Sequence, residues 1–213
     1  MSKPRPVHPY IRECENFECR FRYPVTEVTG KEHICPACHG PTKIITQYPH
    51  HPQQSPIPLS RPKFSLLLDN IRSVFNVGSI FRSADGCGLV DHMYLCGITP
   101  TPDHNKMAKT SLGAEKNISW SYHRNGERLA KNLFSAGCHL IALEATQQSV
   151  PLSHFTTDQV SKTCIFMVGN EVAGLDPTLL ELAEAQIHIP MHGIKESLNV
   201  AIAASILLYS LTD

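Results

Sequence analysis

Four cysteines near the amino terminus have the spacing of a metal site. They form two pairs separated by fifteen residues, Cys14 with Cys19 and Cys35 with Cys38. Such pairs at the tips of two turns supply the four thiolates of a tetrahedral zinc site. In a reducing cytosol, metal is favoured over the alternatives of two disulfides or four free thiols. His33 and His39 flank the second pair and could replace a cysteine, although four thiolates already satisfy zinc.

Aromatic and basic side chains alternate beside the first cysteine pair. The stretch from Phe17 to Tyr23 interleaves aromatic rings with Arg20 and Arg22. Rings that stack on unpaired bases, and arginines that contact phosphates, are typical of a surface for single-stranded RNA. The alternative is that Phe17 and Phe21 form the small core of the segment. A segment this short cannot fold on such a core alone, so metal would supply most of its folding free energy.

A second concentration of polar residues follows an apolar run. Residues 64–68 predict a buried strand, after which apolar residues recur at helical spacing at positions 77, 80, 81 and 84. Arg82 lies off this stripe, one turn after Gly78, and we expect it to project over the loop that carries Asn76. A helix that begins at the carboxyl end of a strand is a usual place for a ligand crevice. The alternative is a surface arginine on an ordinary helix.

Two later blocks also place polar residues after strands. The apolar run 164–168 predicts a strand that leads into a glycine-containing loop, residues 169–175. A further strand over 186–189 is stopped by Pro190, and a loop over 192–196 leads to Ser197. We expect Ser197 to cap a last helix over 198–211. That helix is apolar almost all round, which predicts that it is buried.

The sequence between these blocks predicts alternating strands and helices. Strands are expected over 91–96, 118–122 and 139–145, and helices over 127–136, stopped by Gly137, and from Pro177 to about 185, capped by Asp176. This order predicts an α/β fold with a mainly parallel sheet. We expect four cysteines to be core residues: Cys87, Cys96, Cys138 and Cys164.

Residues 97–116 predict a long loop in the larger part of the chain. The loop carries three lysines, Lys106, Lys109 and Lys116. Loops of this length in compact domains are usually functional or disordered. The lysines therefore either grip a phosphate backbone or are simply solvated.

Composition divides the chain. Residues 49–63 contain five prolines and predict a linker between a four-cysteine domain, residues 1–48, and a larger domain, residues 64–213. Residues 1–63 hold nine Lys or Arg against five acids, whereas residues 64–213 hold ten against fourteen. The first part is therefore the one expected to meet a polyanion. With no signal peptide and no apolar run of about 18 residues, we expect a soluble cytoplasmic protein without a membrane partner.

Three blocks together resemble a known family. They are Asn76-x-Gly78-x3-Arg82, Gly169-Asn170-Glu171-x2-Gly174-Leu175, and Ile189-Pro190-Met191-x-Gly193-x3-Ser197-Leu198-Asn199-Val200. In order and content they resemble the three motifs of the SpoU/TrmH-type RNA ribose 2′-O-methyltransferases of the SPOUT superfamily. The resemblance covers about residues 64–213, and residues 109–115 also look like a segment seen in some members. An amino-terminal zinc ribbon is a departure from the minimal architecture of the family.

The resemblance implies a fold and a cofactor. In members of the family the carboxyl-terminal segment threads a deep trefoil knot, which is a rare exception to the rule against threading. The knot would hold S-adenosylmethionine, and members are usually homodimers with the site near the interface, so the last helix is a candidate contact. By motif position the implied cofactor contacts are Leu143, Gly169, Ile189, Met191 and Leu198.

The resemblance also implies a reaction, the methylation of a ribose 2′-hydroxyl in tRNA or rRNA. The implied catalytic group is Asn76, Arg82, Glu171, Ser197 and Asn199. Because a guanidinium stays protonated in proteins, we expect Arg82 to position phosphate or a developing alkoxide. The alternative that Arg82 also takes the proton of the hydroxyl stays open at this point. Asn76 and Ser197 would orient Arg82 or the ribose. Glu171 would tie the loops together or form a structural ion pair, and the zinc ribbon would dock RNA.

Three rival functions stay open at this point. The first is a non-catalytic RNA-binding or ribosome-assembly protein that has kept the knot, and the filled motif positions argue against it. The second is a base methyltransferase of the same superfamily, although the run from Ser197 to Asn199 favours ribose. The third is a zinc-ribbon transcription factor, which would leave the three blocks without a purpose.

Overall fold

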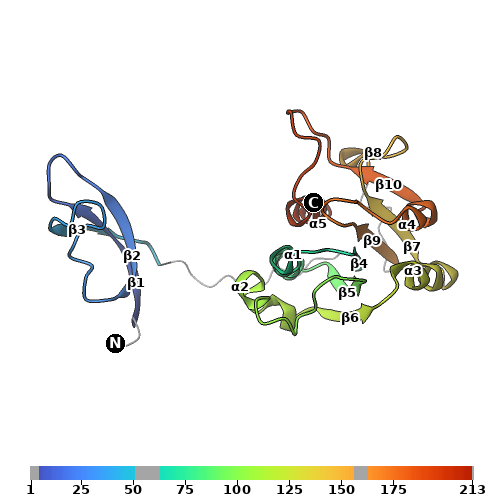
Figure 1. Ribbon diagram of the computed structural model, residues 1–213, viewed down its shortest axis with the longest axis horizontal. Helices are drawn as coiled ribbons and strands as arrows, with labels where there is room; N and C mark the ends of the chain where they lie inside the picture. Colours follow the sequence, from blue (N-terminus) through green and yellow to red (C-terminus); the bar gives the residue numbers. More distant parts are fainter. Residues whose placement is uncertain (1–4, 51–62, 156–162, 213) are drawn as a thin grey trace. The chain divides into compact units, whose positions relative to one another are not determined.

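The chain divides into two compact units, residues 1–56 and residues 57–213 (Figure 1). The computed structural model describes residues 5–50, 63–155 and 163–212. Most of the predicted proline-rich linker, residues 49–63, lies outside the described residues. Each unit is therefore described by itself.

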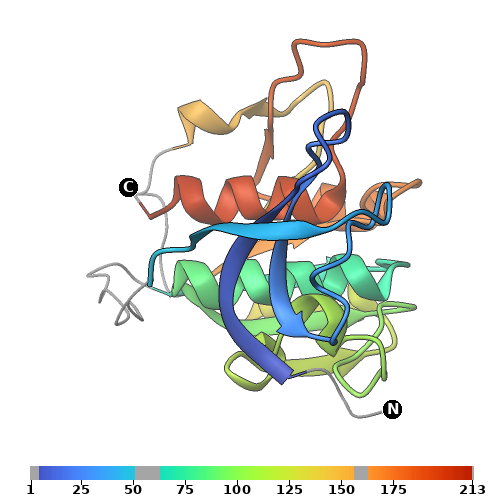
Figure 2. The same ribbon diagram turned by 90° about the vertical axis from the view of Figure 1, so that its left-hand side faces the viewer.

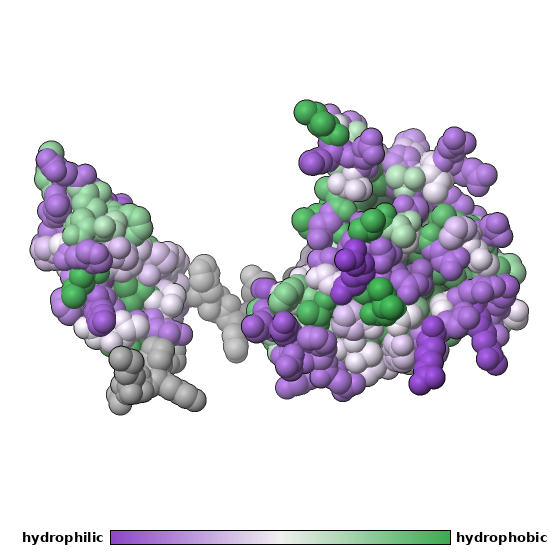
Figure 3. Space-filling model, viewed as in Figure 1, coloured by the Kyte–Doolittle hydropathy of each residue, from purple (hydrophilic) through white to green (hydrophobic). Residues whose placement is uncertain are grey.

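The smaller unit is a three-stranded antiparallel sheet. The central strand β1 (Arg5–Cys14) pairs with β2 (Arg22–Val28) on one side and with β3 (Thr42–Gln47) on the other. Very little apolar surface is buried here, and green apolar side chains lie on the surface in Figure 3. The exposed large apolar side chains of the unit are Phe17, Phe21, Val28, Ile34, Ile44, Ile45 and Tyr48. A unit without a larger core needs another source of stability.

The aromatic residues beside the first cysteine pair are not that core. Phe17 is 86% exposed and Phe21 is 43% exposed. Tyr23 is half-buried, and its hydroxyl donates a hydrogen bond to the backbone oxygen of Glu32 at 2.5 Å. The interpretation of Phe17 and Phe21 as a small hydrophobic core is therefore wrong, and their rings are available to a partner.

The larger unit is built on one seven-stranded sheet. Its strand order is β6-β5-β4-β9-β7-β10-β8, and every neighbouring pair is parallel, so the predicted α/β fold with a parallel sheet is confirmed. All carboxyl ends consequently meet at one edge, where ligands bind in open α/β sheets. The strands are β4 (Phe64–Asp69), β5 (Val90–Cys96), β6 (Ser119–His123), β7 (His139–Leu143), β8 (Val150–Pro151), β9 (Cys164–Val168) and β10 (Ala185–His188).

Helices cover both faces of this sheet (Figure 1). On one face, α1 (Val74–Cys87) and α5 (Val200–Ser210) pack over a core that includes Phe64 and Phe166. On the other face, α3 (Gly126–Ser135) and α4 (Pro177–Leu182) pack over a second core. Since both faces are buried, the central strands are apolar throughout rather than alternating.

The first and last long helices run side by side in the same direction, as Figure 2 shows. Near their starts, Asn199 donates a side-chain hydrogen bond to Asn76 at 3.1 Å, and further along, the hydroxyls of Ser83 and Ser205 are 2.7 Å apart. The chain segments that follow β4 and β10 are thereby brought together. The trefoil knot implied by the resemblance stays a prediction.

The structure corrects two predicted helix starts. Helix α1 begins at Val74 with Ser73 as its cap, so Asn76 lies in the first helical turn rather than in a loop. Helix α5 begins at Val200 and is capped by Asn199, so the prediction that Ser197 caps it is wrong. In both cases the side chain of the capping residue accepts a hydrogen bond from a backbone N–H of the first turn, and this hydrogen bond fixes where the helix begins.

Other boundaries also moved. The predicted long loop over 97–116 contains a short helix, α2 (Ala108–Ser111), and a 3-10 turn, η1 (Ala114–Lys116). Helix α4 ends at Leu182, earlier than predicted, and a further 3-10 turn, η2 (Leu152–His154), follows β8. Of the predicted core cysteines, Cys87, Cys96 and Cys164 are buried, and Cys138 is half-buried against the second core.

The prediction that the last helix is wholly buried is wrong. Ile202 and Tyr209 are each about half exposed, and Ile206 lies between them on the same side of α5. An apolar helix face that stays in water is typical of a contact surface. In the described part of the chain, no helix has the length and apolar character needed to cross a membrane.

Every residue of the central strand β9 is buried. Phe166 is fully buried, and its ring meets Phe64 and Phe155 edge-on at centroid distances of 5.0 and 5.8 Å. We expect Phe166→Ala to lower the free energy of unfolding by about 3–5 kcal/mol, because it leaves a cavity in the core.

Urea denaturation followed by tryptophan fluorescence measures this loss. The single tryptophan of the chain, Trp120, lies in β6, so its signal reports on the larger unit alone. Phe134→Ala removes an exposed ring from α3 and is the matched control, expected to change the free energy by less than about 0.5 kcal/mol. Equal losses for the two variants would contradict the assignment of the core.

Candidate functional site

A cavity of about 470 Å³ opens at the carboxyl edge of the sheet. It lies where β7, β9 and β10 end, and its walls are completed by the 169–175 loop and by the segment that leads into α5. Small-molecule sites of open α/β sheets occupy this position. All five residues predicted to contact a cofactor line the cavity: Leu143, Gly169, Ile189, Met191 and Leu198.

The 169–175 loop is a closed turn that requires glycine. Asn170 and Gly174 exchange two backbone hydrogen bonds of 3.0 and 2.9 Å. A Cβ on Gly169 would lie 2.2 Å from the backbone nitrogen of Leu175, so no side chain fits there. Gly174 has a φ of +76°, in the left-handed region that favours glycine. The turn consequently brings its backbone close to the cavity.

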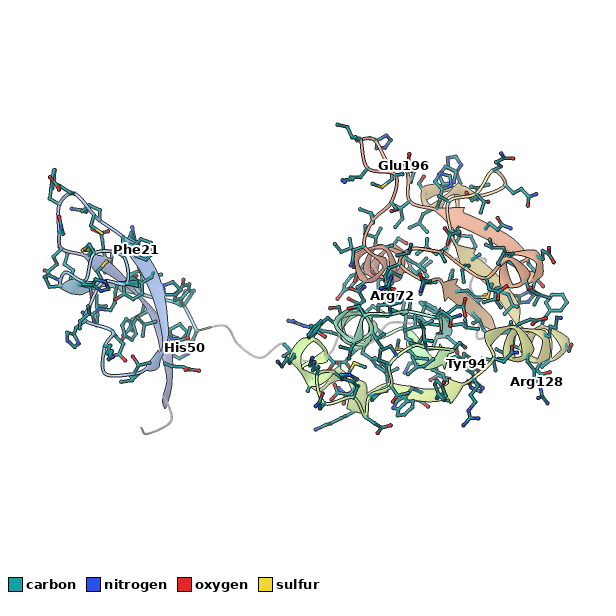
Figure 4. All side chains as sticks on the ribbon, in the orientation of Figure 1. Phe21, His50, Arg72, Tyr94, Arg128 and Glu196 are labelled. Atoms are coloured by element: carbon teal, nitrogen blue, oxygen red, sulfur yellow. The ribbon has the colours of Figure 1, made fainter. Side chains whose placement is uncertain are left out.

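Glu171 joins this turn to the start of α1. Its two carboxylate oxygens accept hydrogen bonds from the backbone N–H groups of Arg72 at 2.8 Å and Ser73 at 3.0 Å, and from the side-chain amide of Asn76 at 2.8 Å. Arg72 is labelled in Figure 4. The predicted tie between loops is thereby confirmed. All three donors are uncharged amides, and among the residues that the structure describes no ion pair involves Glu171.

These hydrogen bonds affect the charge of Glu171. Partial burial alone would raise the pKa of the carboxyl group, but the hydrogen bonds from Arg72, from its own backbone and from Asn76 outweigh burial, so the pKa lies below its usual value. The carboxylate is therefore ionised at neutral pH. A carboxylate that stays ionised and already accepts several hydrogen bonds positions its partners and is a poor general base.

Asn199 links the third block to the first. Its side-chain oxygen accepts from the backbone N–H of Ala201 at 2.9 Å, which caps α5, and its side-chain nitrogen donates to Asn76 at 3.1 Å. Ser197 also lies on the cavity wall. Among the predicted catalytic residues, Glu171, Ser197 and Asn199 thus line the cavity, and Asn76 joins them through hydrogen bonds.

Arg82 is the predicted catalytic residue that this geometry leaves out. It is exposed, it does not line the cavity, and no hydrogen bond or ion pair holds it among residues 5–50, 63–155 and 163–212. It follows Asn76 by six residues on α1, which places it about 9 Å further along the axis and on a different side of the helix. The prediction that Arg82 projects over Asn76 is therefore wrong.

The face of α1 that carries Arg82 also carries an exposed large apolar residue. Phe75 precedes Arg82 by seven residues and lies on the same side of the helix. A Cβ on Gly86, one turn further on, would lie 2.8 Å from the hydroxyl of Tyr209, so this face adjoins the exposed face of α5. We call this combined surface, formed by Phe75, Arg82, Ile202, Ile206 and Tyr209, the two-helix face.

Sequence reasoning missed Glu144. This residue follows β7 directly and lines the cavity, and its carboxylate accepts a hydrogen bond from the backbone N–H of Leu175 at 3.1 Å. A Cβ on Gly174 would lie 3.1 Å from its oxygens. The sequence does indicate this position, because an acidic residue directly after a buried strand lies at the edge of the sheet where ligands bind.

Asp69 supports the same edge from within. It is 3% exposed and accepts hydrogen bonds from the side chain of Asn70 at 2.8 Å and from the backbone N–H of Asp176 at 3.3 Å. Burial raises the pKa of its carboxyl group. Asp69 thus holds the ends of β4 and the 169–175 loop together below the cavity.

In the smaller unit, the four predicted cysteines meet at one point. The sulfur atoms of Cys14, Cys19, Cys35 and Cys38 all lie within 4.8 Å of one another. Tetrahedral zinc with Zn–S bonds of about 2.3 Å requires sulfur atoms about 3.8 Å apart. The distance from Cys19 to Cys35 is 3.8 Å and that from Cys14 to Cys38 is 3.4 Å, both too long for disulfides. The donor set and spacing fit zinc.

Comparison with known proteins agrees with this geometry. The sequence model of the SpoU rRNA methylase family matches residues 63–209. The chain is 30% identical over 187 residues to the 23S rRNA (guanosine(2553)-2′-O)-methyltransferase RlmP of Bacillus subtilis, covering 88% of this chain and 67% of the relative. It is 28% identical over 145 residues to the tRNA (guanosine(18)-2′-O)-methyltransferase of Aquifex aeolicus, covering 66% of this chain and 64% of the relative.

Solved structures show the same fold. An S-adenosylmethionine-bound rRNA methyltransferase from Sinorhizobium meliloti superimposes with a TM-score of 0.64 at 27% identity, covering 82% of this chain and 64% of that one. The TrmH/SpoU tRNA-modifying enzyme of Aquifex aeolicus superimposes with a TM-score of 0.63 at 25% identity, covering 72% and 76%. The chain thus spans about two thirds of the length of the curated relatives it matches.

The geometry around Glu171 predicts a pH effect on stability. A carboxyl group whose pKa is depressed in the folded state contributes stability above its unfolded pKa and loses that contribution as pH falls through the folded value. We expect Glu171→Gln to destabilise the larger unit at neutral pH, and the difference from the unsubstituted protein to shrink as pH falls below about 4.

Urea denaturation at a series of pH values, followed by Trp120 fluorescence, measures the difference. Glu181→Gln neutralises an exposed carboxylate on α4 and serves as the matched control. If the free energy of unfolding of Glu171→Gln stays lower by the same amount down to pH values well below the usual pKa of glutamate, the ionised form of Glu171 is not what stabilises the fold.

Proposed function

The chain belongs to the SpoU rRNA methylase family, and we propose that it transfers a methyl group from S-adenosylmethionine to a ribose 2′-hydroxyl of tRNA or rRNA. One observation carries the proposal. The cavity at the carboxyl edge holds all five positions implied for the cofactor, and Glu171, Ser197 and Asn199 stand on its wall. Relatives named for methylation of each RNA class support the choice of substrate.

The cavity suits the cofactor in size and in chemistry. Its volume of about 470 Å³ lies within the range of small-molecule sites. The absent side chain of Gly169 lets the 169–175 turn close on itself at the cavity wall, and Leu143, Ile189 and Leu198 supply apolar walls. When bound, S-adenosylmethionine supplies an electrophilic methyl group. We keep the trefoil knot as part of this proposal.

The side chains at the cavity divide the work. Glu171 is a positioning residue, since its oxygens already accept three hydrogen bonds. Asn76 is held between Glu171 and Asn199 and fixes the start of α1 against α5. In the described part of the chain no hydrogen bond occupies the Ser197 hydroxyl, so it is free to orient the ribose. The proton of the 2′-hydroxyl leaves through phosphate or water.

Arg82 does not line the cavity of its own chain, and a second copy of the chain offers another way to bring this side chain to a cavity. The two-helix face around Arg82 is apolar and exposed, and it can pair with the same face of another copy about a two-fold axis. We infer a homodimer of this kind, in which the Arg82 guanidinium of one protomer stands over the cavity of its partner. There its fixed charge and fork geometry stabilise the phosphate and the developing alkoxide.

The function predicts the effect of removing this guanidinium. We expect Arg82→Ala to lower methyl transfer by about 100-fold or more, with little change in S-adenosylmethionine affinity, because the arginine acts on the reacting centre. RNA from cells that lack the protein is the substrate, and mass spectrometry of its nucleosides locates the methyl group. Lys131→Ala, an exposed change on α3, is the control. Unchanged turnover by Arg82→Ala, or methylation of a base, would contradict the proposal.

Mixing two inactive variants tests the dimer. Arg82→Ala keeps an intact cavity, whereas Gly169→Val keeps Arg82 but disrupts the 169–175 turn on the cavity wall, because a Cβ there would lie 2.2 Å from the backbone nitrogen of Leu175. If Arg82 acts across a two-fold interface, an equal mixture should recover about a quarter of the unsubstituted activity, since half of the dimers are mixed and each has one complete site. Absence of recovery, in a mixture shown by native mass spectrometry to contain mixed dimers, would place Arg82 in its own subunit's site.

We infer that zinc holds the smaller unit together and that this unit docks RNA. The four sulfur atoms have the required spacing, and a Cβ on Gly40 would lie 3.3 Å from the Cys38 sulfur, so the second turn packs closely on the metal position. The exposed rings of Phe17 and Phe21 are available for stacking on bases. A reducing cytoplasm, which we propose as the location, keeps the thiolates free to bind metal.

Metal removal tests the zinc proposal. We expect about one zinc per chain, and we expect a strong chelator to unfold the smaller unit while Trp120 fluorescence of the larger unit stays unchanged. Amide hydrogen exchange over β1, β2 and β3 measures the unfolding. Cys35→Ser should reproduce the effect, whereas Cys138→Ser in the larger unit should not. Full protection of the three strands after chelation would refute a structural zinc.

A further inference from the structure

A second cavity, which unlike the first is lined by arginines, lies on the same edge of the larger unit. It has a volume of about 370 Å³ and forms where β6 ends and α3 begins. Apart from Leu129, the residues that line it are polar, aromatic or basic: Tyr122, His123, Arg124, Asn125, Arg128 and Asn132. We call it the β6–α3 groove. No predicted or described residue of the methylation site lies in it.

The groove is positively charged. Arg124 and Arg128 both line it, and none of the lining residues is acidic. The nearest acidic residue on α3, Glu127, forms an ion pair of 2.6 Å with Lys131. Among the described residues neither arginine forms an ion pair, and both are exposed, with Arg128 extending away from α3 in Figure 4. Two unpaired guanidinium groups around one hollow suit a phosphate-bearing ligand.

The arginines, rather than the helix end, supply this charge. The first turn of α3 is already capped, because the side-chain oxygen of Asn125 accepts a hydrogen bond from the backbone N–H of Arg128 at 2.8 Å. Tyr122 adds a ring that is 45% exposed, and such a ring can stack on a base or a sugar. The groove thus offers phosphate contacts and a stacking platform together.

The groove is held at a fixed place relative to the first cavity. The Tyr122 hydroxyl donates to the backbone oxygen of Gly97 at 2.8 Å, and the neighbouring N–H of Ile98 donates to the side chain of Asn70 at 3.2 Å. The side chain of Asn170, on the wall of the first cavity, donates to the backbone oxygen of Asn70 at 2.7 Å. A continuous chain of hydrogen bonds therefore connects the two hollows.

The separation of the two hollows suits one RNA strand. Three strand spacings lie between β6 and β9, which is about 14 Å along the carboxyl edge of the sheet. A few nucleotides of single-stranded RNA span such a distance. We propose that the β6–α3 groove binds the sugar–phosphate backbone next to the methylated nucleotide, so that the strand lies along this edge with its target ribose at the cofactor cavity. This inference rests on the proposed function.

The salt dependence of RNA binding tests the groove without knowledge of the natural substrate. The probe is a labelled RNA stem-loop of mixed sequence, titrated with the full-length protein at several salt concentrations. For Arg124→Gln with Arg128→Gln we expect binding weaker on the order of ten-fold, and a slope of log affinity against log salt that is smaller by about 1.4, because two phosphate contacts to a single strand are lost. Both side chains are exposed, so folding should be unaffected.

Two controls make the result specific. Arg128→Gln and Lys131→Gln each remove one positive charge from the same helix, but only Arg128 lines the groove. We expect the Lys131 variant to keep the slope of the unsubstituted protein. An unchanged slope for the double variant, or equal losses at Arg128 and Lys131, would overturn the proposal. Unchanged RNA affinity of the double variant would likewise overturn it.

S-adenosylmethionine binding and methyl transfer separate this proposal from the proposed function. We expect the double variant to bind S-adenosylmethionine with unchanged affinity, and to raise KM for RNA about ten-fold with kcat nearly unchanged. If the unsubstituted protein methylates ribose and the double variant has the same KM for RNA, the groove proposal is refuted and the proposed function stands. If the double variant shows the expected change in slope but the unsubstituted protein transfers no methyl group, the proposed function is refuted and RNA binding by the groove stands.

Discussion

The carboxylate of Glu171 is the contact on which the rest of the site depends. It accepts two backbone hydrogen bonds at the start of α1 and one from Asn76, which lies 95 residues earlier in the chain. Hydrogen bonds to an ionised acceptor are stronger than neutral ones, so three of them fix the 169–175 turn against α1. Asn76 then fixes Asn199 and with it the start of α5. The two parts of the cavity wall that these residues belong to, the 169–175 turn and the segment that ends at Asn199, are therefore held together through Asn76.

Much of the architecture is predictable because its signals are local. An uninterrupted apolar run defines a strand buried on both faces, and the strand predicted over 164–168 is observed as β9 with the same limits. Gly137 has a φ of +85° directly after the helix that it was predicted to stop, and Asp176 caps α4 with Pro177 at its start. The cofactor positions implied by motif all line one cavity, because carboxyl ends of parallel strands share one edge.

The remaining features depend on tertiary contacts that a sequence does not display. Ser197 and Asn199 can both cap a helix, and Asn199 is the cap in a structure where Asn76 also engages its amide. Because α1 already includes Asn76, Arg82 lies six residues further along the same helix and on a different side of it from Asn76. An apolar helix pattern likewise predicts burial without saying whether the chain itself or another molecule covers it, which is why the exposed face of α5 was missed.

The two uses of the Asn199 side chain link the cavity to the two-helix face. One end of its amide caps α5, and the other end holds α1 through Asn76. A ligand that steadies the segment before Asn199 therefore also steadies the relative position of both helices that carry this face. In the proposed dimer, ligand binding would strengthen dimerisation by the same factor by which dimerisation strengthens ligand binding. In a dimer built this way, raising the cofactor concentration would increase the fraction of dimer, and raising the subunit concentration would increase the fraction of cofactor-bound protein.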